Sequence, residues 1–491
     1  MTVPAGAQQP PPPAPSSASL PPQTPDPIAA ALAPRAGGLT AEEAGKLAAK
    51  TKPNVRAKQE DLKVAAAKVD QALVGFFPRV SLTASYTRLS PVPGFGLGGG
   101  ALVGAANAGP ISANCDANGA CTVVDSKGSP LAAQSVSFPV PLNSYSFQAS
   151  LVVPVSDYVF RLSQSYASAS HNEKAARLTA EAEALQAAVD GKVAYFNWVR
   201  ARGSAVVASE AVEQAKAHVD DAKKSFSVGL ASKADVLRIE AQLAAAQQSL
   251  AESQAFASIA EEQLRTVIGV PPDKHLEIGS DVMHEAASAP SETLQGLQDQ
   301  ALQRRLEIRS LDETVYSLKE VESLTKAGYL PRIDAFADAA LSNPNQRVFP
   351  QTNKFYGTWD VGVRLSWTLN DTFTTIGAAA EAKARKNSVI EQKGALRDGL
   401  RIEVASAYAD AAKAPPTIEA ADRGLVAAEE SLRVRRELFR NGKATSSELV
   451  DAEAELTRAR LRRLDAHIGL LVARAKLDHA SGRDVPARPA E

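Results

Sequence analysis

The sequence is poor in the features that mark disulfide-rich, nucleic-acid-binding and helical membrane proteins. Its 491 residues include two cysteines and 5% aromatic residues, and 54 basic residues are balanced by 55 acidic ones. The net charge of -1 leaves no basic excess for binding nucleic acid. No run of 18 apolar residues occurs, so no transmembrane helix is predicted. Much of the 45% hydrophobic content is alanine, which suits closely packed long helices better than a thick globular core.

Motifs for catalysis and for cofactor or metal binding are also missing. The six histidines are scattered along the chain, and no Gly-x-Ser-x-Gly nucleophile motif is present. We therefore predict that the protein is not an enzyme and that it has no catalytic, cofactor-binding or metal-binding residues.

The two ends of the chain differ in composition from the rest. Residues 1–38 are rich in proline, alanine and serine, and are predicted to be a disordered or polyproline leader. They lack a basic segment followed by an apolar core, so the sequence shows no signal peptide; the chain is either mature or begins at a start codon placed too late. Residues 486–491 are predicted to form a C-terminal tail.

A Gly-x-x-Pro-Arg motif occurs twice and organises the chain. It begins at Gly75 in the sequence GFFPRV and at Gly328 in the sequence GYLPRI. In both places a run with helical character stops at the motif, because glycine frees φ and proline removes an N–H group. The residues that follow alternate between apolar and polar, as in a strand. The chain is thus predicted to pass twice from a helix directly into a strand.

Four strands are predicted, at about 80–89, 144–156, 333–341 and 357–370. The second and fourth are the clearest, with apolar residues at every second position: Tyr145, Phe147, Ala149, Leu151, Val153 and Val155, and Trp359, Val361, Val363, Leu365, Trp367 and Leu369. Strands of about ten residues with one apolar and one polar face are typical of a membrane β-barrel, which contacts lipid outside and water inside. An antiparallel sheet on a soluble core would give the same pattern.

The segment between the first two strands, residues 90–143, is predicted to be a long loop because it is rich in Gly, Pro, Ser and Asn. It contains both cysteines, Cys115 and Cys121. Two cysteines that close a short turn in an otherwise cysteine-free protein favour one disulfide in an oxidising compartment. A metal site is disfavoured, because two thiolates without a nearby histidine provide too few ligands.

Long helices are predicted for most of the remaining sequence. Residues 160–228 contain no proline and little glycine, and can form one helix of about 100 Å at 1.5 Å per residue. After a turn, the returning helix extends to Ile268. It has the seven-residue spacing of coiled-coil packing, at Val236, Leu243, Leu250, Ala257 and Leu264. Pro415 and Pro416 fall inside the corresponding second long helix and are expected to bend it.

The second half of the chain repeats the first at a constant offset of 213 residues. The matched pairs include Phe226 and Phe439, Gly229 and Gly442, Asp235 and Glu448, Glu240 and Glu453, and Gly269 and Gly482. We predict two structural repeats, residues 39–274 and 275–485, each made of helix, strand, loop, strand, long helix, tip and returning helix. The predicted fold is mainly α, with long antiparallel coiled-coil helices, four strands per protomer and an internal duplication.

Taken in order, these features resemble the TolC family of outer-membrane efflux proteins. The resemblance covers about residues 39–485 and rests on the helix start at Thr40 with Glu43 in a capping box, the two Gly-x-x-Pro-Arg junctions, the two-faced strands and the two Phe-x-x-Gly tips. It implies a homotrimer in which each protomer gives four strands to one barrel in outer-membrane lipid, while the helices form a tunnel in the periplasm. The physics agrees in part, because four strands cannot close a barrel and an open sheet in lipid leaves backbone groups unsatisfied.

The resemblance also implies a function and partners. The protein would be the exit duct of a tripartite efflux or type I secretion system in a Gram-negative bacterium, conducting substrates passively. Its partners would be an inner-membrane pump and a periplasmic adaptor protein. The adaptor would meet the helical tips at Phe226, Gly229, Phe439 and Gly442.

Charged residues just after the tips are candidates for a periplasmic gate. Glu448 and Asp451 share one face of the returning helix, and in the resembling family acidic residues at these positions ring the closed end. Asp235 and Arg238 are their counterparts in the first repeat. Such rings would favour cations in a narrow mouth. A solvated outer face of a coiled coil would carry similar charges.

The alternative function is that of a soluble periplasmic coiled-coil scaffold or tether without pore activity. Such a protein would have the same heptads, but it would not need the apolar strand face that carries Trp359 and Trp367. Dependence of the purified protein on detergent distinguishes the two functions.

Overall fold

The computed structural model describes residues 27–91, 95–96, 101–103, 109–134, 137–138, 141–284, 286–349 and 351–486. The chain divides into two compact units. The first is made of Met1–Val64, Glu173–Thr314 and Val389–Glu491, and the second of Ala65–Asn172 and Val315–Ser388. Because each unit takes segments from both halves of the chain, neither unit corresponds to one sequence repeat.

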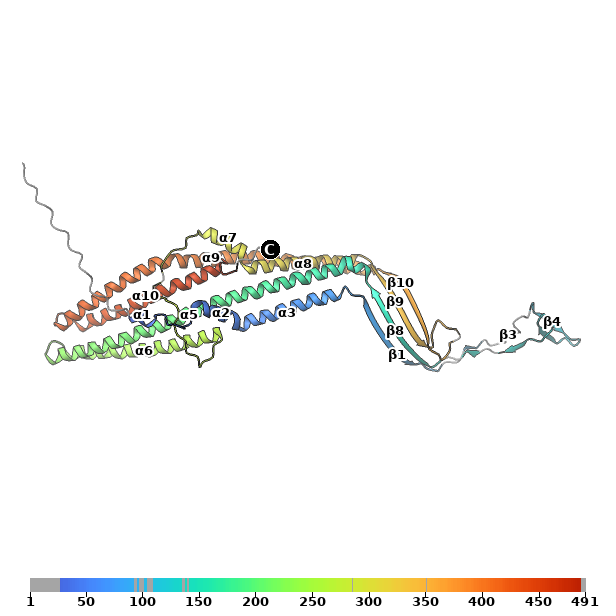
Figure 1. The fold of residues 1–491 in the computed structure, drawn as a ribbon, viewed down its shortest axis with the longest axis horizontal. Helices are drawn as coiled ribbons and strands as arrows, with labels where there is room; N and C mark the ends of the chain where they lie inside the picture. The colour runs from blue at the N-terminus through green and yellow to red at the C-terminus, as the bar shows by residue number, and fades with distance from the viewer. Residues whose placement is uncertain are drawn as a thin grey trace, which may run out of the picture. The chain divides into compact units, whose positions relative to one another are not determined.

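The second unit is built on a four-stranded antiparallel sheet with the order β1-β8-β9-β10 (Figure 1). Its strands are β1 (Arg79–Arg88), β8 (Asn143–Val153), β9 (Arg332–Asn343) and β10 (Tyr356–Ser366). All four predicted strands are present, and the pairing of β8 with β9 joins the two repeats. Two strands end earlier than predicted. Pro154 ends β8 because it has no N–H to donate, and the helix α9 (Leu369–Arg440) begins directly after β10.

Both Gly-x-x-Pro-Arg motifs connect a helix to a strand as predicted. The first follows α3 (Pro53–Val74), and the second follows α8 (Leu306–Lys326) through a 3-10 turn (Ala327–Tyr329). A side chain at Gly75 would place its Cβ 3.0 Å from the carbonyl oxygen of Ala72, and one at Gly328 would lie 2.6 Å from the hydroxyl of Thr375. Both glycines are therefore required for close packing.

Asp157, in the short helix α4 (Val155–Asp157) after β8, supports the second junction. Its side chain is buried and forms a 2.8 Å ion pair with Arg332, the arginine of the second motif. Arg161 lies 3.6 Å from the same carboxylate. A five-residue π-helix (Tyr158–Leu162) then leads into α5. The sequence analysis did not identify Asp157, because only the fold brings it to the second motif.

The insertion between β1 and β8 is predicted to be a single loop, but the chain pairs with itself there. The antiparallel pairs are β2 (Phe95–Gly96) with β7 (Ser137–Phe138), β3 (Ala101–Val103) with β6 (Ala132–Gln134), and β4 (Ser112–Cys115) with β5 (Cys121–Val124). Pairing of this kind gives the backbone groups of a long insertion their hydrogen bonds. The sequence analysis missed it because glycine and proline dominate the segment.

The first unit contains two long helix hairpins. They consist of α5 (Ser163–Ser227) followed by α6 (Lys233–Ile268), and α9 followed by α10 (Ser446–Ala480), with the first residues of α5 and α9 belonging to the second unit. The repeated features superimpose on the sequence offset: Gly229 and Gly442 both have positive φ, as do Gly269 and Gly482. The helix α9 continues through Pro415 and Pro416.

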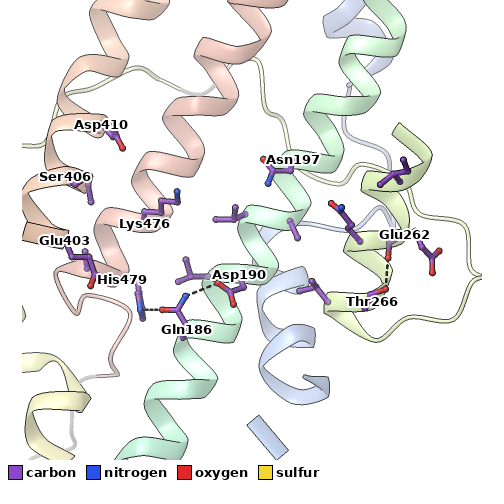
Figure 2. A pocket seen from close by; sticks show the side chains of 18 residues that line it. Gln186, Asp190, Asn197, Glu262, Thr266, Glu403, Ser406, Asp410, Lys476 and His479 are labelled. Atoms are coloured by element: carbon purple, nitrogen blue, oxygen red, sulfur yellow. Dashed lines mark hydrogen bonds between the residues drawn. The ribbon is translucent and has the colours of Figure 1, made fainter. Parts of the chain in front are cut away.

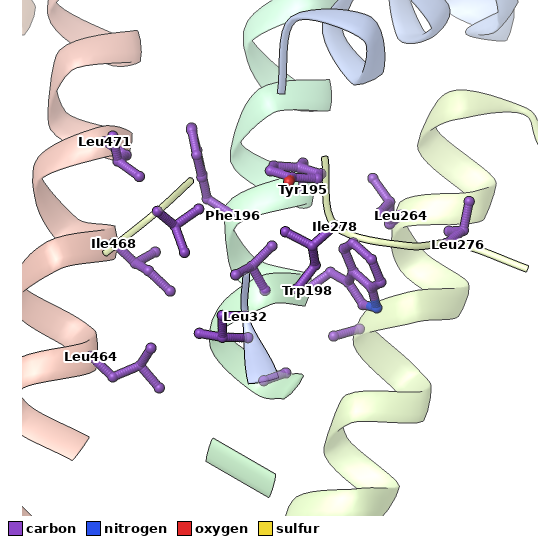
Figure 3. Packing of buried hydrophobic residues seen from close by; sticks show 14 of the residues in the cluster. Leu32, Tyr195, Phe196, Trp198, Leu264, Leu276, Ile278, Leu464, Ile468 and Leu471 are labelled. Carbon is purple, nitrogen blue, oxygen red and sulfur yellow. The ribbon is translucent and has the colours of Figure 1, made fainter. Parts of the chain in front are cut away.

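An apolar core joins α5, α6 and α10 (Figure 3). Its largest fully buried side chains include Trp198, Tyr195, Leu264, Leu464 and Ile468. Two short helices pack nearby: α2 (Ala41–Thr51), which begins with the predicted capping box of Thr40 and Glu43, and α7 (Leu294–Arg304).

The same core corrects the predicted extent of the leader. Ile28, in α1 (Pro27–Ala31), and Leu32 are each only 1% exposed and belong to this core, so the predicted disorder is wrong for residues 27–38. Apolar residues four positions apart lie on one side of a helical turn, and here they fill space between the long helices. Residues 1–26 and 487–491 lie outside the described residues.

Candidate functional site

One face of the four-stranded sheet is an exposed apolar surface, which we call the apolar sheet face. In β10, Trp359, Val361, Val363 and Leu365 are 66% to 72% exposed. The register places their neighbours on the same face, namely Ile333, Ala335, Ala337 and Ala339 of β9, Phe147, Ala149 and Leu151 of β8, and Val80, Leu82 and Ala84 of β1. The predicted two-faced pattern is therefore present across all four strands.

Aromatic side chains lie at both ends of the apolar sheet face. Tyr86 and Tyr145 stack at 5.0 Å near the loop end of β1 and β8. Exposed aromatic side chains at the helix end include Phe77 and Trp367. The strands between them carry aliphatic residues, as on the outer surface of membrane barrels, where aromatic girdles flank an apolar band about 25 Å tall.

The opposite face of the sheet is polar and charged. Asp334 and Asp338 of β9 lie directly across from Arg364 and Asp360 of β10. The guanidinium group of Arg364 lies 4.9 Å from the ring centre of Phe336, the next residue of β9 that points to this face. The two faces thus differ sharply in polarity within one thin sheet.

The two hairpin tips have the same backbone turn but different surfaces. The predicted tip residues Gly229 and Gly442 adopt left-handed φ values of 77° and 69°, which a residue with a side chain rarely tolerates. Phe226, by contrast, is 48% exposed, whereas its counterpart Phe439 is 5% exposed. Near Phe226, Val228 and Leu230 are also exposed. The first tip therefore presents an apolar surface that the second tip lacks.

Among the gate candidates, Asp235 has two structural contacts. It is the third residue of α6 and forms a capping box with Ser232, whose backbone N–H and hydroxyl donate to Asp235 Oδ2 at 3.0 and 2.7 Å. The hydroxyl of Ser446 at the start of α10 donates to Oδ1 at 2.5 Å. The bonds from Ser446 and Ser232 hold the pKa of Asp235 below its ordinary value. Asp235 thus links the beginnings of α6 and α10.

Glu448 has the same position in the second hairpin. It caps α10 by accepting the N–H of Thr445 at 2.9 Å, and it forms a 2.9 Å ion pair with Arg435 of α9. The hydrogen bond from the Thr445 backbone is the main cause of its lowered pKa. Asp451 and Arg238, the other two candidates, are exposed on α10 and α6.

A further ion pair joins the two hairpins and was missed in the sequence. Arg440, at the end of α9, donates to one carboxylate oxygen of Asp221 in α5 at 2.8 and 3.0 Å. Both residues lie within two turns of their tips. Their pairing could not be predicted, because it depends on how the hairpins pack side by side.

The two cysteines lie at the far end of the insertion between β1 and β8. Cys115 and Cys121 are directly opposite in the β4–β5 register and form a disulfide. The turn between them is held by Asp116, whose side chain accepts the N–H groups of Asn118 and Ala120. This hairpin is exposed and covalently closed.

The long helices of the first unit also line a cavity of about 1000 Å³, shown in Figure 2. Gln186 connects two of its polar residues: its amide nitrogen donates to Asp190 at 2.9 Å, and its oxygen lies 3.0 Å from Nε2 of His479. Lys52 forms an ion pair with Asp190. Glu403 and Asp410 of α9 lie on the other side of the cavity, so its wall is polar and largely acidic.

Two searches of the structure gave no candidates. Within the part of the chain that the structure describes, none of the helices has the length and apolar character to cross a membrane. Among the same residues, no three His, Cys, Asp or Glu side chains are grouped so that they could hold a metal ion.

Solved structures with a similar fold are outer-membrane proteins of low sequence identity. CusC, studied for its folding and transmembrane channel formation, has a TM-score of 0.71 and 16% identity over 90% of this chain and 92% of its own. The CmeC outer membrane channel of Campylobacter jejuni has a TM-score of 0.69 and 14% identity, covering 90% and 85%. For the outer membrane protein VceC of Vibrio cholerae the values are 0.68 and 15%, covering 90% and 96%. No curated protein matches the sequence.

The sequence pattern of a known family covers both repeats. The pattern described as "outer membrane efflux protein" matches residues 124–270 and 297–483, and each match contains one helix hairpin. The two matches together span more than half of the 491 residues, and they agree with the internal duplication. The chain belongs to the outer membrane efflux protein family.

Proposed function

We propose that this protein is the outer-membrane exit channel of a tripartite efflux or type I secretion system. Three copies would form one pore that conducts substrates passively from the periplasm to the exterior. The observation that carries the proposal is the apolar sheet face, whose aliphatic and aromatic side chains are exposed over all four strands. An apolar surface of this extent favours contact with lipid.

The edges of the sheet support assembly into a shared barrel. Within the described residues, β1 and β10 each pair with a neighbouring strand on one side only. In lipid, an open edge leaves N–H and C=O groups without partners, at several kcal/mol for each group. Joining β10 of one protomer to β1 of the next would satisfy these groups. The polar face with Asp338, Asp360 and Arg364 would then line the water-filled interior.

The hairpin tips support contact with a periplasmic adaptor protein. The first tip exposes Phe226, Val228 and Leu230 around Gly229, whereas the second tip, with Phe439 and Gly442, is largely filled by its own packing. An inner-membrane pump would supply the energy, because a passive channel needs none of its own. The insertion with Cys115 and Cys121 would extend outside the cell from the opposite end of the strands.

The gate proposal rests on Glu448, Asp451, Asp235 and Arg238. Asp235 and Glu448 already have structural roles as helix caps, so neutral variants must preserve hydrogen bonding. Glu448→Gln combined with Asp451→Asn meets this requirement, because glutamine is also accepted in a capping box. The matched control is Glu455→Gln on the same helix, where Glu455 pairs with Arg458 and Arg462.

Recording in planar lipid bilayers tests the proposal. The purified protein should require detergent, cross-link as a trimer and form ion-conducting pores, and the double variant should lose cation selectivity while Glu455→Gln keeps it. A protein that stays monodisperse without detergent and gives no pores would instead be a soluble scaffold. Pores with unchanged selectivity in the double variant would place Glu448 and Asp451 outside the conduction path.

A further inference from the structure

Three titratable or charged side chains are buried together near the second tip. His218 of α5, Arg436 of α9 and Glu453 of α10 lie beside an apolar cluster, which we call the tip cluster, composed of Val219, Ala222, Ile239, Ala428, Leu432, Phe439, Leu449, Ala452, Leu456 and Ala459. His218 is 1% exposed and Glu453 is 3% exposed. Because a buried charge is costly unless it is paired, such residues need a specific explanation.

The three side chains approach one another without completing their hydrogen bonds. Nε2 of His218 lies 3.9 Å from Oε2 of Glu453 and 3.5 Å from Nη2 of Arg436. Nδ1 of His218, Oε1 of Glu453 and Nε of Arg436 are buried, and have no hydrogen-bond partner among the residues that the structure describes. The group is therefore not a well-formed ion pair, and its stability depends on which atoms carry protons.

The surrounding charges set the preferred state of each group. Around His218, Asp221 and Arg440 pair with each other at 2.8 Å, and Arg436 adds a positive charge. Burial, and then Arg436, lower the pKa of His218 to about 4. Burial raises the pKa of Glu453 to about 7, although Arg436 acts in the opposite direction. On α6, which also contributes to the tip cluster, Glu240 is paired with Lys223 of α5 at 3.0 Å.

We propose that His218 and Glu453 form a proton-compensating pair that keeps the packing of the second tip almost independent of pH. When the helices separate and water reaches both groups, the imidazole binds a proton at Nε2 and the carboxylic acid loses one from Oε2. When the helices pack, that proton returns to the carboxylate. In mildly acidic solution the packed and open forms therefore hold the same number of protons, while the pair changes from neutral to charged.

The compensation follows from two opposite linkages. The pKa of Glu453 is higher in the packed state than its ordinary value of 4.5, so this residue alone would favour packing at low pH, by about tenfold between pH 8 and pH 6. The pKa of His218 is lower than its ordinary value of 6.5, so this residue alone would favour packing at high pH, by roughly fourfold over the same range. Together they leave a net change of about two- to threefold.

The internal duplication supplies a natural comparison. At the offset of 213 residues, Lys223 and Glu240 of the first hairpin correspond to Arg436 and Glu453, and Ser431 corresponds to His218. In the first hairpin the two charged groups form an ordinary partly exposed ion pair. The compensating pair is thus a property of the second hairpin, and Glu240→Gln is the matched control for Glu453→Gln.

Hydrogen–deuterium exchange of the purified full-length protein tests the proposal, and its result does not depend on whether the protein conducts. Protection of amides in residues 215–222 and 449–456 is measured at pH 6, 7 and 8 and corrected for the intrinsic exchange rate. The wild type and Glu240→Gln should change by no more than about threefold. Glu453→Gln should lose roughly fourfold in protection from pH 8 to pH 6, whereas His218→Gln should gain about tenfold.

The double variant, His218→Gln with Glu453→Gln, should again be independent of pH. Opposite signs in the two single variants and their cancellation in the double variant establish the pair. The proposal is overturned if both single variants respond to pH as the wild type does, if both shift in the same direction, or if the wild type itself changes by tenfold or more.

Discussion

Ser446, the first residue of α10, donates a 2.5 Å hydrogen bond to Asp235, the third residue of α6. The serine is fully buried, and the same carboxylate accepts from the backbone and hydroxyl of Ser232. One acidic side chain therefore caps its own helix and ties it to the other hairpin.

Removal of this bond by Ser446→Ala should destabilise the protein by about 1.5 to 3 kcal/mol at neutral pH, the range for hydrogen bonds to charged groups. Because Asp235 has a lowered pKa in the folded state, its contribution exists above the ordinary value of 3.8 and is lost as the pH falls through the lowered value. The difference between the variant and the wild type should therefore shrink near pH 3. Denaturation midpoints at pH 7 and pH 3 measure this, with Ser447→Ala as the exposed neighbour control; an equal loss at both pH values would contradict it.

The apolar sheet face should not tolerate charge. Val363→Arg would place a cation in the middle of the proposed lipid-facing band, at a cost of about 2 to 4 kcal/mol, and should reduce assembly in the outer membrane. The polar-face control is Gln148→Arg, because Gln148 lies between Thr83 and Ala340 in the register, whereas Ser366 lies opposite Arg332 and would add a like-charge contact. Heat-resistant trimers in membrane fractions report assembly. If both variants assemble equally, the apolar face does not contact lipid.

Two helical glycines should respond in opposite ways to alanine. At Gly191 in α5 the new Cβ would lie 2.7 Å from the backbone oxygen of Ala44 and 2.8 Å from Cβ of Ala48, so Gly191→Ala should cost about 1 to 3 kcal/mol. At Gly394 in α9 no atom lies within 4 Å, and Gly394→Ala should stabilise the helix by about 0.5 to 1 kcal/mol. Thermal unfolding of the two variants beside the wild type measures the signs; a stabilised Gly191→Ala would mean that α2 is not packed against α5 in this way.

The disulfide between Cys115 and Cys121 should be reached from outside the cell. A membrane-impermeant thiol reagent should label intact cells only after treatment with reductant, since the oxidised pair has no free thiol. Cys115→Ser with Cys121→Ser should abolish labelling and serves as the control. Labelling that requires permeabilised membranes would place the insertion on the periplasmic side and reverse the proposed topology.

The local features of the fold were predictable from the sequence because they depend on neighbouring residues. Alternation gave the strands, the Gly-x-x-Pro-Arg motifs gave the helix ends, and Thr40 with Glu43 gave a capping box that is present in the structure. By the same logic, Ser232 with Asp235 and Thr445 with Glu448 also match the capping pattern, so a closer reading would have found the structural role of both acidic residues.

Features that depend on packing were not predictable. Phe226 and Phe439 occupy equivalent places in the repeat, yet only the second is buried, because the surroundings of the two tips differ. Ile28 and Leu32 lie beside a proline-rich segment whose composition conceals their place in the core. The approach of His218 to Glu453 joins residues more than 200 positions apart, and no local pattern in a single sequence indicates it.

The hold of Asp157 on Arg332 has a consequence for the history of the chain. The carboxylate follows β8 of the first repeat, the arginine opens β9 of the second, and these two strands are neighbours in the sheet. Had the halves once been separate polypeptides, each would have met a second molecule at this seam. In the fused chain the seam is internal, and either half expressed alone would expose a strand edge and bury an acid or a base without its counter-ion. The duplication has therefore become irreversible: the two copies now fold only as one gene product.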